Sequence, residues 1–342
     1  MRSQALGADQ PRPSEESEQY SSKQRLDLRL MHHYSVYTAQ AFTSATRSEH
    51  ASAAILIDIP RLALEHIFLM DTVLLVSMIH LGCTDPQSLD GLPVIQYRDQ
   101  ALRSFRQAVA NTTEQNISAV RTASQLLAAV SFASDRVTKH SGFWIVNWLA
   151  LAVGQRNFPL SYSRPPVSPR NEGIQHKSSL YGSFIDIPVH PVVLTDIQHI
   201  LPSDKNDDHW PDRHVLWEAA EDIGTLIAIL RLPHEQSWLE TKIKAWAFDK
   251  MPHDVLRLIR NGNPCALIIL AYYLVLLKFL PDVWLYEDVA SHDIQIIQEM
   301  LGPEWRQHLT IPMKALDMCD KTSIVELLTS RLPVAEQAAL NS

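Results

Sequence analysis

The segment from Leu62 to Leu81 limits the possible folds most strongly, because apolar residues occur on every side of it when it is drawn as a helix. Such a helix has to lie in the middle of a bundle, since none of its faces suits solvent. The sequence Asp58-Ile59-Pro60 predicts the start of this helix, with an acidic N-cap and a proline in the first turn. Gly82 predicts its end.

Apolar residues with helical spacing continue along most of the chain, whereas the alternation typical of strands is hard to find. Glycine is scarce, with 10 in 342 residues, which also argues against an all-β fold. We therefore predict an all-α, multi-helix bundle of about ten to twelve helices. Besides the central helix, the expected helices cover residues 25–44, 91–110, 117–134, 141–154, 187–200, 213–231, 235–249, 263–280, 287–301 and 322–331.

Composition divides the chain into an N-terminal segment and a helical domain. Residues 1–24 combine prolines, serines and glutamates with little apolar surface, so we expect this segment to be disordered. Residues 25–342 form the expected helical domain. Irregular seams are predicted within it near residues 155–185, where prolines and serines gather, and near residues 202–212, where the chain is acidic.

Charge and cysteine content limit the compartment and the partners. The net charge is −8, so the surface repels phosphate backbones and disfavours free-standing DNA binding. Cys83, Cys265 and Cys319 are far apart, which indicates a reducing compartment. The longest apolar runs, Ala266–Leu277 and Phe143–Val153, are shorter than the ~18–20 residues that cross a bilayer. We expect no secretory signal, no membrane contact, and a nuclear or cytoplasmic location.

Four segments between Asp27 and Pro312 carry short patterns in a fixed order. They are Asp27–Tyr34 with its His-His-Tyr ending, the proline-led helix from Ile59 to Leu81, Tyr97–Arg106 with its Ala-Leu pair, and Asn263–Tyr273 followed by Trp284 and Trp305. Together they resemble the C-terminal regulatory domain of fungal zinc-cluster transcription factors, in particular the sterol-uptake control regulators. The resemblance covers most of the chain, and residues 25–342 would be the regulatory domain.

The sequence departs from that family in two places. The zinc cluster needs six closely spaced cysteines, and this chain has none before Cys83, so no direct DNA contact is expected. A full activator whose upstream zinc-cluster exon is missing from the sequence is one explanation. Relatives tend to carry a Trp-Trp pair and a following glycine where this chain reads Val283-Trp284-Leu285-Tyr286-Glu287-Asp288, which affects the shape of any ligand pocket there.

The resemblance implies a pocket for an apolar, sterol- or terpenoid-like ligand between the C-terminal helices. Aromatic residues with a polar tip suit such a ligand when it carries one hydroxyl. The alternative is that these residues fill a core, as apolar helical stripes usually do. The residues that would line the pocket are Ile268, Ile269, Tyr272, Tyr273, Leu276, Trp284 and Leu301.

No catalytic, cofactor or metal site is predicted. His209 and His214 lie among aspartates in the acidic seam, but no helix would hold them in a metal-binding geometry. His66 and His80 are expected to share one helical face as structural groups. Cys83 follows His80 by one helical turn, but nothing supplies an orienting group or an oxyanion site. Glycine-rich phosphate loops and hydrolase or zinc-protease motifs do not occur in the sequence.

A basic ridge is predicted on the outer side of the helix at 91–110. Arg98, Arg103 and Arg106 fall largely on one side of that helix, and Arg121 is expected nearby. Few acidic residues occur at the spacing that would pair with them. The ridge is either a solvated face or a protein contact.

We therefore predict a transcription-regulatory protein that contacts a protein partner, such as a full-length activator, or forms a homodimer through helical surfaces. An apolar small molecule is a possible ligand. The alternative is a natural-product cyclase or isomerase on the same helical fold, with Tyr272, Tyr273, Trp284 and His292 around the substrate. Such an enzyme would guide its reaction by shape and hydrogen bonds, and needs few sequence motifs.

Overall fold

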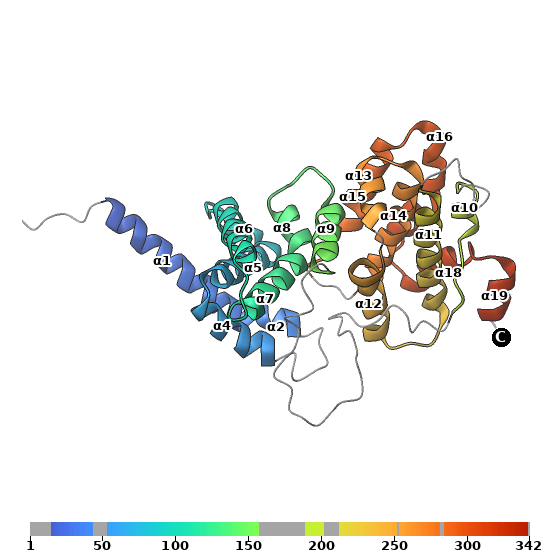
Figure 1. Cartoon of the computed structure of the whole chain (residues 1–342). Helices are drawn as coiled ribbons and strands as arrows, with labels where there is room; N and C mark the ends of the chain where they lie inside the picture. Colours follow the sequence, from blue (N-terminus) through green and yellow to red (C-terminus); the bar gives the residue numbers. More distant parts are fainter. Residues whose placement is uncertain are drawn as a thin grey trace, which may run out of the picture.

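The computed structural model describes residues 15–43, 53–156, 189–201, 212–251, 253–280 and 284–340. All regular elements in these ranges are helical and none is a strand, so the all-α prediction is confirmed. The predicted seams at 155–185 and 202–212 lie almost entirely outside the described residues. The helices gather into two lobes that follow the order of the sequence (Figure 1).

The N-terminal lobe is built around one central helix. Helix α5 has Leu69 and the run from Thr72 to Gly82 buried, and it packs against α1, α4, α6, α7 and α8. The predicted central position of this segment is therefore confirmed. The helices of the lobe are α1 (Glu15–His33), α2 (Ala39–Thr43), α4 (Ile59–Glu65), α5 (Ile67–Thr84), α6 (Val94–Ala110), α7 (Ile117–Ala129) and α8 (Ser131–Val137).

The C-terminal lobe surrounds a second helix that is buried along its whole length. Helix α14 begins at Pro264, with the Asn263 side chain accepting the amide of Ala266 at 3.1 Å, and it packs against α11, α13, α15 and α17. The helices of this lobe are α10 (Thr195–Gln198), α11 (Arg213–Ala228), α12 (Gln236–Ala245), α13 (His253–Arg260), α14 (Pro264–Leu276), α15 (Val289–Met300), α16 (Pro303–Arg306), α17 (Thr310–Asp317), α18 (Lys321–Thr329) and α19 (Val334–Leu340).

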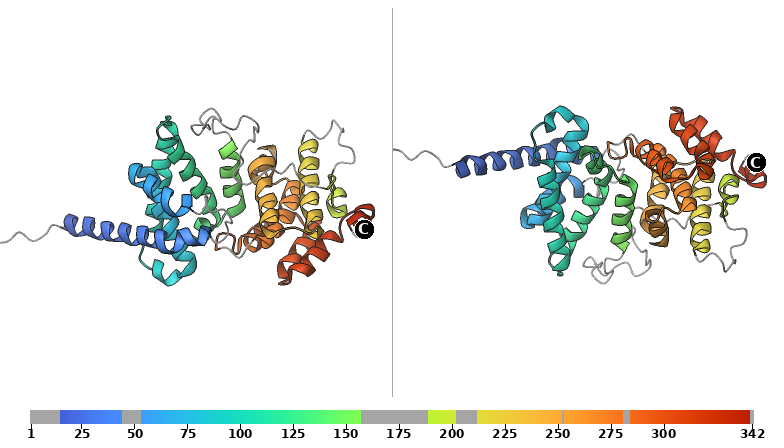
Figure 2. Two further views of the ribbon diagram at one scale, coloured as in Figure 1. Left: turned by 90° about the horizontal axis from the view of Figure 1, so that it is seen from below. Right: turned by 90° about the horizontal axis from the view of Figure 1, so that it is seen from above.

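Helix α9 (Trp144–Arg156) lies between the two lobes, as the views from below and above agree (Figure 2). Its apolar residues, including Trp144, Ile145 and Trp148, belong to the core of the C-terminal lobe, although α9 also contacts α7 and α8. The two cores are therefore joined through α9. Helix α1 projects away from the N-terminal lobe in all three views.

Several boundaries differ from the sequence predictions. Helix α1 begins at Glu15, ten residues before the expected start at 25, because the glutamates, glutamines and lysine there have a high helix propensity. The segment expected as one central helix is broken at His66, whose extended backbone has φ −131° and whose carbonyl accepts the amides of Leu69 and Met70. His66 and His80 therefore do not share one continuous helical face.

Asp58 and Gly82 do not have their predicted roles at the helix ends. Asp58 is itself helical, at the end of a π-helical turn (Ala54–Asp58), and its side chain caps nothing. Gly82 is buried inside α5, which continues to Thr84. A Cβ at Gly82 would lie 2.3 Å from the Leu89 side chain, so the Leu89 side chain would have to move to accept a larger residue there.

Among the described residues, one helix and one bent pair of helices have the length and hydropathy of a membrane span. Helix α5 has 18 residues with a mean hydropathy of 1.8, but 61% of it is buried against its neighbours, as in a core helix. A second candidate would join α13 to the segment Pro264–Phe279 across a bend of 109°. Neither feature distinguishes a span from a core helix.

Candidate functional site: a cleft beside the junction of the lobes

Six of the seven predicted ligand residues lie in the core. Ile268, Ile269, Tyr272, Tyr273 and Leu276 on α14, and Leu301 after α15, are each no more than 3% exposed. None of them lines either of the two hollows described below, beside Trp284 and beside Ile95. Their burial matches the core interpretation, and ligand binding by them stays a prediction.

The two tyrosine hydroxyls on α14 are already engaged inside the protein. Tyr272 donates to the Asp196 carboxylate at 3.3 Å, and Tyr273 donates to the carbonyl of Ile243 at 3.1 Å. Burial raises the pKa of both phenols well above the ordinary value, so they are neutral donors. Each hydroxyl proton is therefore used in a hydrogen bond inside the protein.

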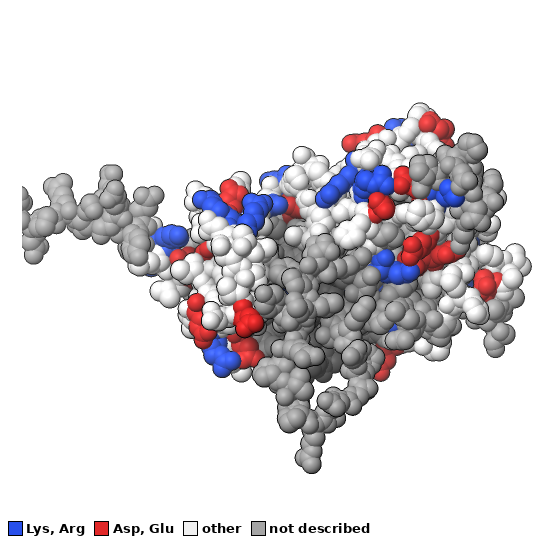
Figure 3. Space-filling model, viewed as in Figure 1, with Lys and Arg blue, Asp and Glu red and all other residues white. Residues whose placement is uncertain are grey.

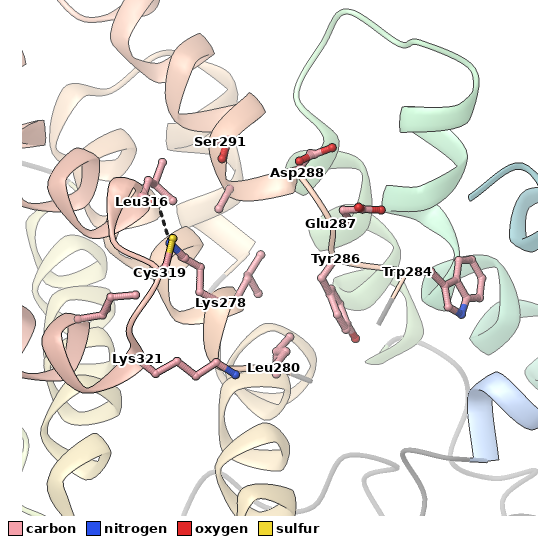
Figure 4. Close-up of a pocket in the computed structure, with 13 residues that line it drawn as sticks. Lys278, Leu280, Trp284, Tyr286, Glu287, Asp288, Ser291, Leu316, Cys319 and Lys321 are labelled. Carbon is pink, nitrogen blue, oxygen red and sulfur yellow. Dashed lines mark hydrogen bonds between the residues drawn. The ribbon is translucent and has the colours of Figure 1, made fainter. Parts of the chain in front are cut away.

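Trp284, the seventh residue, lines a cleft of about 510 Å³. The cleft lies between the turn at 284–288 with the start of α15 on one side and the connection from α17 to α18 on the other (Figure 4). Its lining mixes apolar side chains with charged and polar ones, among them Glu287, Ser291, Cys319 and Lys321. A cleft of this size can accept a small molecule, and its chemistry is amphipathic.

Lys278 stands at the base of the cleft but is not a free cation. Its ammonium group donates to the carbonyls of Ala315, Leu316 and Met318 at 3.0, 2.7 and 2.7 Å. These are carbonyls at the C-terminal end of α17, which lack helical partners and carry partial negative charge. Burial lowers the pKa of Lys278. The residue therefore fixes one wall of the cleft.

The turn at 284–288 is held to the N-terminal lobe by one guanidinium. Arg136 on α8 donates to the carbonyls of Trp284 and Glu287, both at 2.7 Å, and lies 3.2 Å from the Glu287 carboxylate. The Trp284 ring makes edge contacts with His80 and Phe42, at centroid distances of 4.9 and 5.7 Å. One side of the cleft is thus part of the contact between the lobes.

A polar cluster lies under Trp284 in the N-terminal lobe. Nδ1 of His80 is 3.1 Å from both the Thr38 hydroxyl and Nε2 of His33. Burial, and secondarily the charge of His33, lowers the pKa of His80 to about 4, and burial also lowers the pKa of His33. Both imidazoles are therefore neutral near pH 7. His33 turns inward while His32 is exposed, as their sequence positions suggest.

A second polar contact joins α9 to α15. The buried Asp293 carboxylate accepts the backbone amides of Trp144 at 3.1 Å and Ile145 at 2.6 Å, so it caps the start of α9 from another element. Nδ1 of His292 forms a hydrogen bond with Oδ1 of Asp293 at 2.7 Å. The His292 ring stacks on the Trp144 ring, with 3.7 Å between their centroids. Burial raises the pKa of Asp293, against the lowering effect of these hydrogen bonds.

These contacts show that the four residues of the enzyme alternative do not converge. Tyr272 faces Asp196, Tyr273 faces Ile243, His292 stacks on Trp144, and Trp284 packs on His80 and Phe42. A guided cyclisation needs its aromatic and polar groups around one cavity. The described residues do not provide that arrangement.

The structure also shows where the histidines, Cys83 and the arginines considered in the sequence analysis lie. Within the described ranges, no three His, Cys, Asp or Glu side chains are grouped as metal ligands, and His209 lies outside those ranges. Burial raises the pKa of Cys83, which opposes a reactive thiolate. Arg98 leaves the predicted ridge, because it pairs with the buried Asp135 at 2.7 Å.

Sequence reasoning missed Arg136 and Lys278, which hold the two sides of the cleft, and Asp293, which joins α15 to α9. Arg136 and Trp284 are 148 residues apart, and Asp293 and Trp144 are 149 apart. The only local signal at Arg136 is a basic residue in the last turn of α8, which many helices share. Only the fold shows that these residues meet.

The comparisons with known proteins cover part of the chain. No protein-family model matches it. Over 114 residues, 33% of this chain, it is 38% identical to sterol uptake control protein 2 of Candida albicans, of which the match covers 15%. Over 149 residues, 42% of this chain, it is 33% identical to Zn(2)-C6 fungal-type transcription factor afumD of Aspergillus fumigatus, of which the match covers 38%.

The chain therefore spans between about one seventh and two fifths of the curated relatives it matches. The predicted resemblance to fungal zinc-cluster factors, and to sterol-uptake regulators among them, agrees with the names of both relatives. One relative is named as a fungal Zn(2)-C6 transcription factor and the other as a sterol uptake control protein. The matches cover 33% and 42% of this chain, which is less than the predicted resemblance over most of its length.

Proposed function

We propose that this chain is a transcription-regulatory protein of the fungal Zn(2)-C6 type that works inside the cell, in the nucleus, by contacting a protein partner. The partner is an activator that contains the same helical fold, or a second copy of the chain. The observation that carries this proposal is the similarity to two fungal proteins, one of them named as a transcription factor and one as a sterol uptake control protein.

The placement of side chains supports a protein that binds rather than one that catalyses. The α14 tyrosines are buried and satisfied, and the imidazoles of His33 and His80 are neutral groups bonded within the N-terminal lobe. A protein of this kind acts through its surface and through the arrangement of its lobes. The amphipathic cleft beside Trp284 is the place where a small molecule with an apolar body would bind and favour one arrangement.

The finer proposal concerns the genes under control. One relative is named as a sterol uptake control protein, which favours genes for sterol supply, with genes for secondary metabolites as the second candidate. The proposed ligand class is therefore an apolar sterol- or terpenoid-like compound. Such a ligand would shift the protein from one conformation to another only if it bound one of them more tightly than the other.

Deleting the gene and measuring transcripts beside metabolites tests the proposal. We expect a coherent set of transcripts to change, and to return when the wild-type chain is supplied from another locus. The decisive contrary result is loss of one metabolite with unchanged transcripts, together with conversion of its precursor by the purified chain. That result would support the enzyme alternative.

A further inference from the structure

The outer face of helix α6 presents two arginines between two apolar side chains. The inner face of α6 buries Ala101 and Ala108 and packs against α5. At 100° per residue, Ile95, Arg103, Arg106 and Val109 fall within an arc of about 120° on the opposite side. All four are exposed, with Ile95 at 63% and Val109 at 40%.

Among the described residues, none forms an ion pair with either arginine of this face. Arg103 and Arg106 make no ion pair with any described residue, whereas Arg98 on the same helix is paired with Asp135. Asp99 is the one acidic residue on the outer face of α6. Figure 3 shows basic side chains gathered over the part of the N-terminal lobe that α6 forms. On a chain with a net charge of −8, this local excess of positive charge is unusual.

A hollow lies beside the start of α6, next to the exposed Ile95. Its volume is about 390 Å³, and it is lined by residues 92–96 and 137–139. The exposed Lys139, which has a left-handed backbone with φ of 52°, stands at this hollow and adds a third cation. The hollow is large enough for an apolar side chain of a partner, and Lys139 is the one basic residue in its lining.

We propose that the outer face of α6 binds an acidic amphipathic helix of a protein partner. Arg103 and Arg106 are one helical turn apart, so carboxylates three or four residues apart on the partner can reach both. Apolar side chains on the same face of the partner contact Val109 and Ile95 and enter the hollow. This inference names the kind of partner for the proposed regulatory function and rests on that function for its role in the cell.

Protein fits this face better than nucleic acid does. Duplex binding requires several cations that follow the phosphate spacing, and here two arginines and one lysine stand beside exposed Ile95 and Val109 and the acidic Asp99. Exposed apolar side chains gain nothing from a phosphate backbone but are buried by a helix. The charge sign also selects an acidic partner over a basic one.

Fluorescence anisotropy with the purified full chain tests the proposal. The probe is a fluorescein-labelled peptide of about sixteen residues, long enough for four helical turns, with leucine at every third or fourth position and glutamates between. A peptide of the same composition in scrambled order is the control. We expect the amphipathic probe to bind the chain more tightly, and its affinity to fall as salt is added.

Charge reversal locates the binding. The variant Arg103→Glu with Arg106→Glu is expected to bind the probe at least about tenfold more weakly. The matched control, Arg61→Glu with Arg260→Glu, makes the same change of net charge at exposed sites on other helices and should bind like wild type. Ile95→Ser should also weaken binding. Thermal unfolding of each variant verifies that it folds.

Three outcomes would overturn the inference: no preference for the amphipathic probe, equal losses in both double variants, or tighter binding of a 20-base-pair duplex that the α6 variant alone loses. The transcript measurement is independent of the peptide. A changed transcript set with no peptide binding would therefore reject only this surface, and unchanged transcripts with intact binding would reject only the proposed function.

Discussion

Asp222 on α11 is a buried carboxyl whose ionisation opposes folding. Its side chain accepts the indole N–H of Trp246 at 3.2 Å. Burial raises its pKa to about 7, although the nearby charge of Lys250 acts in the lowering direction. Between the ordinary pKa of a carboxyl group and pH 7, the folded chain therefore keeps a proton on Asp222 that the unfolded chain has released. Because of this difference, the free energy of unfolding decreases as the pH rises through this range.

Replacing Asp222 with asparagine should remove this pH dependence. Between pH 5 and pH 8, the free energy of unfolding of the wild type should fall by roughly 2–3 kcal/mol more than that of Asp222→Asn. This estimate uses about 1.4 kcal/mol for each pKa unit. Urea unfolding at the two pH values measures the difference. Asp58→Asn, which removes an exposed carboxylate paired with Arg61 on α4, is the control. Parallel pH profiles for wild type and Asp222→Asn would contradict this role.

His80 should respond in the opposite direction. Burial lowers its pKa to about 4, so the folded chain keeps His80 neutral while the unfolded chain protonates near pH 6.5. The contribution of His80 to the free energy of unfolding is therefore fully present above pH 6.5, and it is lost as the pH falls toward 4. NMR titration, assigned with His80→Gln, should give a midpoint about two units below the ordinary histidine value. A midpoint near 6.5 would mean that the cluster under Trp284 is open to water.

At the scale of the elements, the sequence predicted most helices but not how their ends are made. The apolar segments that became α5 and α14 were recognisable because they are apolar on all sides, and their burial agrees with that prediction. The break at His66 has no proline or glycine to mark it. The helices α13, α17 and α19 were not predicted, because short helices give few repeats of the apolar pattern.

Helix α9 shows why a helix start can be invisible in the sequence. Its first amides bond to Asp293, which belongs to α15. Asp293→Ala should therefore destabilise the protein by roughly 2–4 kcal/mol, since two buried amides lose a charged acceptor. It should also speed hydrogen exchange in the first turn of α9. Asp320→Ala removes an exposed local cap of α18 and should cost less. If both variants lost the same free energy of unfolding, Asp293 would contribute no more than an exposed local helix cap.

At the scale of the whole molecule, Arg136 on α8 adds a polar contact between the two lobes to the packing of α9 and Trp284. Arg136 makes its contacts to the turn at 284–288 while its side chain is 16% exposed. Arg136→Ala should lower the unfolding free energy by roughly 2–4 kcal/mol, because two carbonyls lose a charged donor. Hydrogen exchange should rise at residues 284–288 before it rises elsewhere.

Two further variants separate this role from a general effect of charge. Arg136→Lys should restore only part of the stability, because one ammonium group cannot match the fork of a guanidinium. Arg61→Ala removes an exposed pair with Asp58 and should change stability by less than about 0.5 kcal/mol. Wild-type stability in Arg136→Ala would mean that the lobes are held together without this contact.

The candidate site shows the limit of sequence reasoning about the whole chain. Trp284 was predicted as a pocket residue and does line the cleft, but six partners proposed for it are in the core. An apolar pattern identifies which residues leave water and does not distinguish a filled core from a cavity. The contacts that shape the cleft join residues far apart in the sequence, so only the folded chain brings them together.

The most direct test of the regulatory account is the order of events after the chain appears in the cell. In a strain that lacks the gene, the chain is placed under an inducible promoter, and nascent transcripts and metabolites are sampled over the first minutes to hours. If the chain regulates transcription, a defined set of transcripts should respond before any metabolite changes. A metabolite that appears first, with nascent transcripts unchanged, would contradict the regulatory account.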